Sequence, residues 1–306
     1  MSWSTADIPD LTGRRALVTG ATSGLGYYTA LELLRHGAEV IVAARNPEKS
    51  ARAAAELALA SGRDAPEIVD LDLSDLASVR TAAEQVLKQH DRLDVLVNNA
   101  GVMATPYRQT TDGFELQVGT NHLGHFALTA RLMPLLAEAP RPRVVTVSSS
   151  MHKSVGGFSR TDLYAAGGYR KWDAYGKSKL ANVLFMLELD RRARAAGSPL
   201  LSAGAHPGFA LTHLQTSGPQ LGGLGLEARA LAVFTRLLAQ PAAAGAWPSL
   251  YAATQPDLRP GSYVGPGFFE YRGAPKVVQP SSTAKDPELA KRLWSWSVEA
   301  TGVNCL

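Results

Sequence analysis

Short apolar runs alternate with longer amphipathic segments along most of this chain. The apolar runs are rich in Val, Ile and Leu and have the length of buried strands. We expect such strands at residues 15–19, 39–44, 67–71, 93–98, 143–148 and 200–205. The segments between them predict helices ending at Gly37 and spanning 47–60, 76–90, 113–137 and a region from before Tyr175 to 196.

Strands separated by helix-length segments favour a parallel sheet with helices on both faces. We therefore predict one doubly wound α/β domain over residues 1–306, with about seven mostly parallel strands. Pro47 suits the start of the second helix, and Ser74 is a candidate cap for the third. In such folds ligands bind beyond the carboxyl ends of the strands. Gly20, Asn98 and Ser149 all follow strand ends, so we expect them at one edge of the sheet.

Composition describes an ordinary globular protein, with 45% hydrophobic and 19% charged residues among 306. The formal charge is +4 without a basic run, so nucleic acid is not an expected partner. No apolar stretch approaches the ~18 residues of a membrane span, and no leader is visible at the start. Cys305 is the single cysteine, which suits a reducing compartment. We expect a cytoplasmic protein with no membrane partner.

The histidines offer no recognisable metal spacing, and we assign no metal ligands. The positions considered were His122, His125, His152, His206 and His213.

A glycine-rich turn follows the first strand and precedes the first helix. It reads Gly20-Ala21-Thr22-Ser23-Gly24-Leu25-Gly26. Glycines let the backbone turn sharply and approach a pyrophosphate, and the helix start presents free N–H groups and a positive dipole end. The turn therefore predicts a dinucleotide site.

Tyr175 and Lys179 are four residues apart, about one helical turn, so their side chains share one helix face. A free phenol titrates near ~10, and a neighbouring cation favours the phenolate. The pair predicts a general acid or base, with the lysine lowering the pKa of the tyrosine.

Together these motifs resemble the short-chain dehydrogenase/reductase family, over residues 10 to about 301. The turn has the spacing Thr-Gly-x-x-x-Gly-x-Gly, and Tyr175-x-x-x-Lys179 supplies the second signature. Three further motifs occur in family order, namely Asn98-Asn99-Ala100-Gly101, Ser148-Ser149, and His206-Pro207-Gly208 with Thr212. The resemblance implies a Rossmann-type fold and hydride transfer between a nicotinamide and a small-molecule substrate.

The resemblance also implies roles for the four catalytic positions. Tyr175 would give the proton in carbonyl reduction, and Lys179 would tune it and hold the nicotinamide ribose. Ser149 would bond the carbonyl oxygen, with Ser148 and Ser150 as competitors for that role. Asn121 would hold a water that extends the proton path.

The same resemblance implies a set of nucleotide-binding residues. They are Gly20, Thr22, Ser23, Gly24, Leu25, Gly26, Arg45, Asp72, Leu73, Asn99, Ala100, Gly101, Tyr175, Lys179, Pro207, Gly208 and Thr212.

The end of the second strand indicates which dinucleotide is bound. NAD sites of this fold place an acid there, whereas this chain reads Ala43-Ala44-Arg45-Asn46. A guanidinium can pair with a 2′-phosphate, so we expect NADP(H). Asp72 matches the family residue that contacts adenine, although a solvated or helix-capping Asp fits equally well.

Ser149 and Tyr175 are 26 residues apart, which is long for the family. This resembles the branch of retinol dehydrogenases and light-dependent protochlorophyllide reductases, which implies NADPH and bulky apolar substrates. The aromatic pair Tyr27-Tyr28 departs from that pattern. We place the substrate segment at about 207–240, with a loop and then a helix at 226–238 that either closes over substrate or packs on the surface.

We therefore expect an NADPH-dependent carbonyl reductase or alcohol dehydrogenase acting on an apolar small molecule. Imine reduction, C=C reduction and epimerisation use the same machinery and stay open, as does a non-catalytic NADP(H)-sensing protein. Relatives pair through the helices near Asn121 and Tyr175, so homodimer, homotetramer and monomer are all open.

Overall fold

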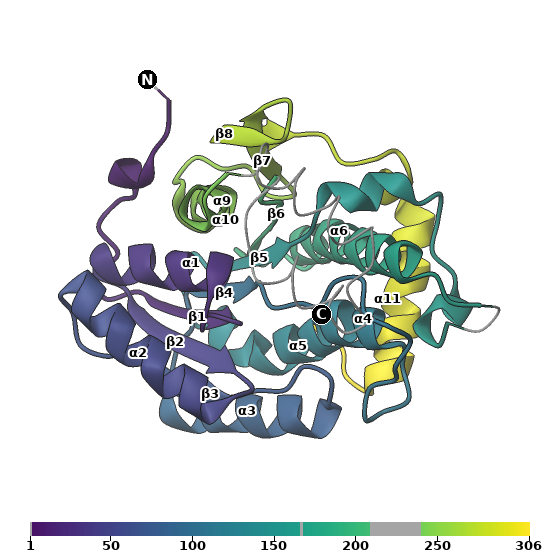
Figure 1. The fold of residues 1–306 in the computed structure, drawn as a ribbon, viewed down its shortest axis with the longest axis horizontal. Helices are drawn as coiled ribbons and strands as arrows, with labels where there is room; N and C mark the ends of the chain where they lie inside the picture. The colour runs from purple at the N-terminus through teal and green to yellow at the C-terminus, as the bar shows by residue number, and fades with distance from the viewer. Residues whose placement is uncertain (1, 166–167, 209–239) are drawn as a thin grey trace.

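One sheet of eight strands runs through the molecule, in the order β3-β2-β1-β4-β5-β6-β7-β8 (Figure 1). The computed structural model describes residues 2–165, 168–208 and 240–306. All neighbouring strands pair in parallel except β8, which runs antiparallel to β7. The strands are β1 Arg15–Thr19, β2 Glu39–Ala44, β3 Glu67–Asp70, β4 Val95–Asn98, β5 Arg143–Val147, β6 Leu201–Ala205, β7 Tyr263–Phe268 and β8 Arg272–Val278.

Helices cover both faces of the sheet, which confirms the predicted doubly wound α/β class. The helices are α1 Gly24–Arg35, α2 Pro47–Ser61, α3 Leu76–Gln89, α4 Leu116–Val118, α5 Gly124–Ala137, α6 Lys171–Ala195, α9 Ala242–Gly245, α10 Trp247–Thr254 and α11 Pro287–Thr301. Short 3-10 turns lie at Thr5–Asp7, Ser150–Ser154, Arg160–Leu163 and Thr283–Lys285.

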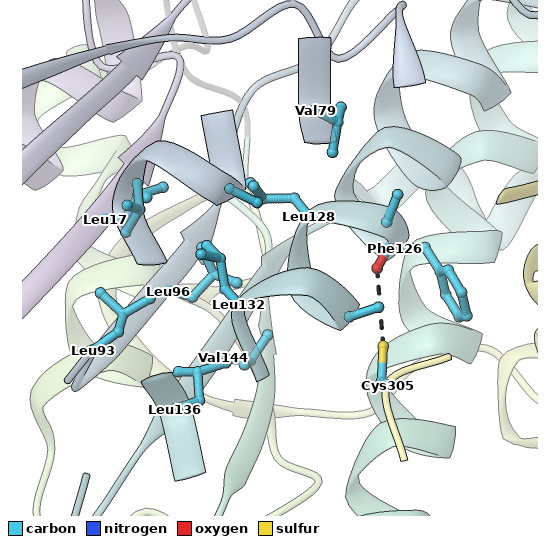
Figure 2. Packing of buried hydrophobic residues seen from close by; sticks show 14 of the residues in the cluster. Leu17, Val79, Leu93, Leu96, Phe126, Leu128, Leu132, Leu136, Val144 and Cys305 are labelled. Atoms are coloured by element: carbon cyan, nitrogen blue, oxygen red, sulfur yellow. Dashed lines mark hydrogen bonds between the residues drawn. The ribbon is translucent and has the colours of Figure 1, made fainter. Parts of the chain in front are cut away.

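Side chains alternate between the two faces of each central strand, because the strand period is two. Leu17 and Leu96 point to the layer that holds α3 and α5, where they pack with Leu132 and Val144 (Figure 2). Val18 and its neighbours point to the opposite layer, which contains α1 and α10. Both layers are dry, so the sheet edge where the strands end is held rigidly from two sides.

The predicted continuous helix over 113–137 is wrong in its first part. The buried carboxylate of Glu115 accepts the backbone N–H groups of Gln117 and Val118, so the helix begins at Leu116. The turn Gly119–Leu123 then widens to i→i+5 bonding before α5 begins. Gly124 permits this close packing, since a Cβ there would lie 2.4 Å from the carbonyl oxygen of Leu73. Widened helical turns of this kind often occur at functional sites.

Two smaller predictions also need correction. Asp75, rather than Ser74, caps α3 by accepting the N–H groups of Ala77 and Ser78. The two C-terminal strands were not located from sequence. Gly265, Pro266 and Gly267 break the apolar pattern of β7, and β8 is an edge strand that is largely exposed.

The C-terminal helix α11 packs across α5 and α6. Trp294 is 3% exposed and contacts the rings of Phe126 and Phe185. The sulfur of Cys305 lies against the carbonyl of Phe126 (Figure 2). No residue in 121–130 or 171–190 is exposed, so these parts of the two helices are covered by the chain itself.

Candidate active site

A cavity of about 750 Å³ opens at the carboxyl edge of the sheet. Every described residue that the sequence predicted to bind nucleotide lines it, from Gly20 at the first strand end to Gly208 after β6. Ser149 lines it as well. Thr212 and the helix predicted at 226–238 lie outside the described residues.

The glycine turn leaves room for a ligand beside the start of α1. Gly20 has φ +67, and a Cβ on Gly26 would lie 2.5 Å from the carbonyl oxygen of Gly20. Ser23 caps α1 without a side-chain hydrogen bond, so the first N–H groups of the helix have no side-chain partner there. These N–H groups and the positive helix end suit a pyrophosphate.

Thr19 ties the glycine turn to the Asn-Asn-Ala-Gly turn. Its hydroxyl accepts the N–H groups of Asn99 and Ala100, each at 2.9 Å. The amide of Asn99 donates to the Thr19 carbonyl at 2.8 Å. Both turns are therefore held in one hydrogen-bonded unit at the cavity wall.

Arg45 stands at the nucleotide end of the cavity, where its side chain is 73% exposed. Its guanidinium lies 3.5 Å from Asp72, whose other oxygen accepts from the N–H and hydroxyl of Ser74. Asn46 and Lys49 also line this end and were missed from sequence. The local signal was available, because Asn46 caps the helix start that carries Lys49.

Three polar side chains lie at the other end of the cavity, namely those of Ser149, Tyr175 and Lys179. Tyr175 on α6 is 6% exposed, and its phenol lies near the Ser149 side chain. Lys179, one turn along α6, is 3% exposed and lies 5.8 Å from the centre of the Tyr175 ring. Its ammonium donates to the carbonyl of Val147 at 3.2 Å.

The three neighbouring serines differ in their surroundings. The hydroxyl of Ser148 is buried and donates to the Lys179 carbonyl at 2.8 Å. Ser150 is exposed, whereas Ser149 is half-buried and accepts the N–H of Met151 at 3.2 Å. Of the three, Ser149 is the one whose side chain acts on the pKa of Tyr175, which it lowers.

Burial dominates the titration of both helical residues. It raises the pKa of Tyr175 to about 12, with a smaller opposing effect of the Ser149 hydrogen bond. It lowers the pKa of Lys179 to about 8. The predicted fall in the tyrosine pKa is therefore not what this structure has, because desolvation of the buried phenol has the largest effect on its pKa.

Asn121 lies behind the cavity rather than in its wall, and it is fully buried. Its side-chain oxygen accepts the N–H of Val102 at 2.8 Å. Its amide nitrogen donates to the Val102 carbonyl and to the Ser178 hydroxyl, each at 2.9 Å. The Asn121 side chain is therefore fully engaged in hydrogen bonds within the protein.

Apolar side chains also line the cavity, and sequence reasoning did not assign them. Trp172 meets the Tyr175 ring edge-on with 6.4 Å between centres, and Met103 and Met151 line the same wall. Trp172 lies one turn before Tyr175 and Met151 two residues after Ser149, so local spacing could have pointed to both.

Two searches of the described residues were negative. Within residues 2–165, 168–208 and 240–306, no group of three His, Cys, Asp or Glu side chains could hold a metal ion. Across the same part of the chain, we find no helix with the length and apolar character needed to cross a membrane.

The fold and the cavity together define a dinucleotide-binding α/β enzyme with a buried Tyr–Lys pair. A family model described as short chain dehydrogenase matches residues 14–219. The chain belongs to the short-chain dehydrogenase family, in its retinol dehydrogenase-like branch.

Three similar proteins illustrate this membership. Retinol dehydrogenase 12 of Mus musculus is 39% identical over 293 residues, covering 96% of this chain and 88% of that protein. The crystal structure of an uncharacterized protein from Mycobacterium paratuberculosis has a TM-score of 0.82 at 42% identity, covering 100% of both chains. A short chain dehydrogenase from Escherichia coli CFT073, complexed with NADPH, has a TM-score of 0.55 at 27% identity, covering 76% of this chain and 93% of that one.

Proposed function

We propose that this protein is an NADPH-dependent oxidoreductase that interconverts a carbonyl and an alcohol on an apolar small molecule. One observation carries the proposal: a buried phenol lies beside a serine side chain and a buried ammonium in the wall of the cavity. A protonated donor held in a dry site is what reduction of a carbonyl requires.

The residues present fit a nicotinamide dinucleotide. Gly20, Gly24 and Gly26 with the start of α1 would hold the pyrophosphate, and Asn99 with Pro207 would flank the nicotinamide half. When bound, this cofactor supplies or accepts the hydride. The protein orients both partners, excludes water and handles the proton.

The proton step falls to Tyr175. With its pKa raised to about 12, the phenol stays protonated through the neutral range and can donate to a developing alkoxide. Ser149, near the phenol, would donate a hydrogen bond to the substrate oxygen as a second partner and stabilise its charge. Lys179 keeps positive charge beside the phenol, and the Asn121 carbonyl would hold a water that continues the path.

The substrate is proposed to be apolar. Met103, Met151 and Trp172 line the cavity, with Trp172 against Tyr175, and such side chains favour hydrocarbon over charged groups. A relative named for retinol, itself an apolar alcohol, supports the same substrate class.

Two further expectations also stay proposals, namely one domain across residues 1–306 and a cytoplasmic location.

A substrate panel tests this function. We expect NADPH absorbance to fall with long apolar aldehydes or ketones and to change little with short charged ones, because desolvating a charge in this wall is costly. Imines and activated alkenes in the same panel separate carbonyl reduction from the other reactions of this machinery. Tight NADPH binding with no turnover of any of these would favour a sensor instead.

Cofactor choice is tested at Arg45. Arg45→Asp should raise the KM for NADPH by about 10- to 100-fold, because a hydrogen bond to a charged group is worth roughly 1.5–3 kcal/mol. The KM for NADH should change little or fall. Arg52→Asp is the matched control, since Arg52 is 83% exposed on α2, outside the cavity. Unchanged NADPH kinetics in Arg45→Asp would defeat the assignment.

A further inference from the structure

His125 on α5 is buried between two parts of the proposed active site. It is 1% exposed. Its Nδ1 lies 3.0 Å from the main-chain oxygen of Asn121, and its Nε2 lies 2.9 Å from the hydroxyl of Thr19. The ring therefore joins the widened turn that carries Asn121 to the end of β1, which holds the Asn99 turn.

The partners determine the tautomer. A carbonyl oxygen can only accept, so Nδ1 must carry the proton that bonds Asn121. In the neutral ring Nε2 then accepts, and the Thr19 hydroxyl donates to it. The two lone pairs of that hydroxyl take the N–H groups of Asn99 and Ala100. Every polar atom in this set is satisfied, which fixes the ring in one orientation.

Burial keeps the ring neutral, which this arrangement needs. It lowers the pKa of His125 to about 4, outweighing the hydrogen bond to Asn121, and the nearby Lys179 charge lowers it further.

We propose that His125 is a positioning residue, which aims the main-chain carbonyl of Asn121 for the proton path behind Tyr175 and Lys179. This inference rests on the proposed function, because it assigns the carbonyl its role in that reaction. His125 contacts no substrate, and it acts through Asn121.

The hydrogen bonds predict an unequal effect of losing the ring. Without His125, the Thr19 hydroxyl can donate to the Val97 carbonyl, already 3.3 Å away, and still accept from Asn99 and Ala100. The cofactor-side turn therefore survives, whereas the Asn121 carbonyl loses its only side-chain donor among the described residues. Turnover should suffer, and cofactor affinity should not.

The first test needs no turnover. In the full chain labelled with ¹⁵N-histidine, the His125 ring should show a protonated Nδ1 and an unprotonated Nε2 at pH 7. The signals are assigned by their loss in His125→Asn. A ring protonated at Nε2 would overturn the proposal, since Asn121 would then have no donor.

The second test is kinetic. His125→Phe keeps the ring volume, and we expect kcat to fall on the order of 10-fold or more while the KM for NADPH stays within about twofold. His125→Asn places an amide donor where Nδ1 was and should recover most of kcat. His122→Phe is the matched control, because His122 is also 1% exposed and bonds Ser297 on α11, away from the cavity.

The kinetic outcomes distinguish failure of this inference from failure of the proposed function. If His125→Phe loses no more kcat than His122→Phe, or if His125→Asn gives no recovery, then His125 is only structural and the inference fails. If the wild type turns over no carbonyl, the proposed function fails, and the carbonyl of Asn121 then has no reaction to serve. The tautomer measurement still decides whether the hydrogen bond exists.

Discussion

Tyr175→Phe is expected to bind NADPH like the wild type and to lose turnover by a factor of about 10² or more, as is typical for a lost acid–base group. The ring remains, so packing against Trp172 is kept and the fold should survive. What disappears is the hydroxyl that lies near Ser149 and stays protonated at neutral pH. NADPH fluorescence titration and single-turnover absorbance measure the two quantities separately.

Tyr263→Phe is the matched control for this loss. Tyr263 is 1% exposed on β7, and its hydroxyl has no hydrogen-bond partner among the described residues. Removing that hydroxyl should leave both binding and turnover close to the wild type. Full activity in Tyr175→Phe would end the acid assignment, and equal losses in both variants would indicate a packing effect.

The sheet could be predicted from sequence because its signal is local. Each central strand is an apolar run bounded by turn residues, and β1 and β2 begin and end where the pattern places them. The C-terminal strands β7 and β8 lack that signal, since glycine and proline interrupt the apolar pattern of β7, and β8 is an exposed edge strand paired only through the β7–β8 hairpin. Tertiary contacts, not local preference, form them.

The features of the site also divide into those that local sequence predicts and those that it does not. Gly20, Arg45 and Ser149 sit directly after strand ends, so topology alone brings them to one edge. The widened turn at Gly119–Leu123 was not predicted, and the bond from His125 to Thr19 could not be, because it joins residues 106 positions apart. The direction of the Tyr175 pKa was also missed, since sequence shows the neighbouring charge but not the depth of burial.

Burial of the Lys179 ammonium destabilises the folded state, and the function of this residue explains why the destabilisation is tolerated. The pKa of its ammonium is lowered from 10.5 to about 8 by burial, so the folded state binds this proton less tightly than the unfolded chain does. Between these values stability rises with pH, and below about pH 8 the whole penalty is present. At pH 7 a shift of this size corresponds to roughly 3 kcal/mol of destabilisation.

Lys179→Met should therefore raise the melting temperature by several degrees at pH 7, because it removes that penalty and keeps the side-chain length. The Val147 carbonyl is not orphaned by the change, since Asn182 also donates to it at 3.0 Å. The same variant should lose turnover by a factor of about 10² or more, because the phenol loses its neighbouring charge. Calorimetry and NADPH absorbance check the two effects.

Lys177→Met is a control on the same helix, and its expected change in stability has the opposite sign. Its ammonium bonds Asp162 at 2.8 Å and Asp173 at 2.9 Å; burial lowers its pKa, but these partners outweigh burial and raise it. That variant should lose a little stability and keep turnover.

Wild-type kcat/KM for carbonyl reduction should also fall as pH rises through about 8, where Lys179 loses its proton. A Lys179→Met protein that melts lower than the wild type would show that the buried charge does not destabilise the fold. A Lys179→Met protein that still turns over substrate would show that the charge does not aid catalysis.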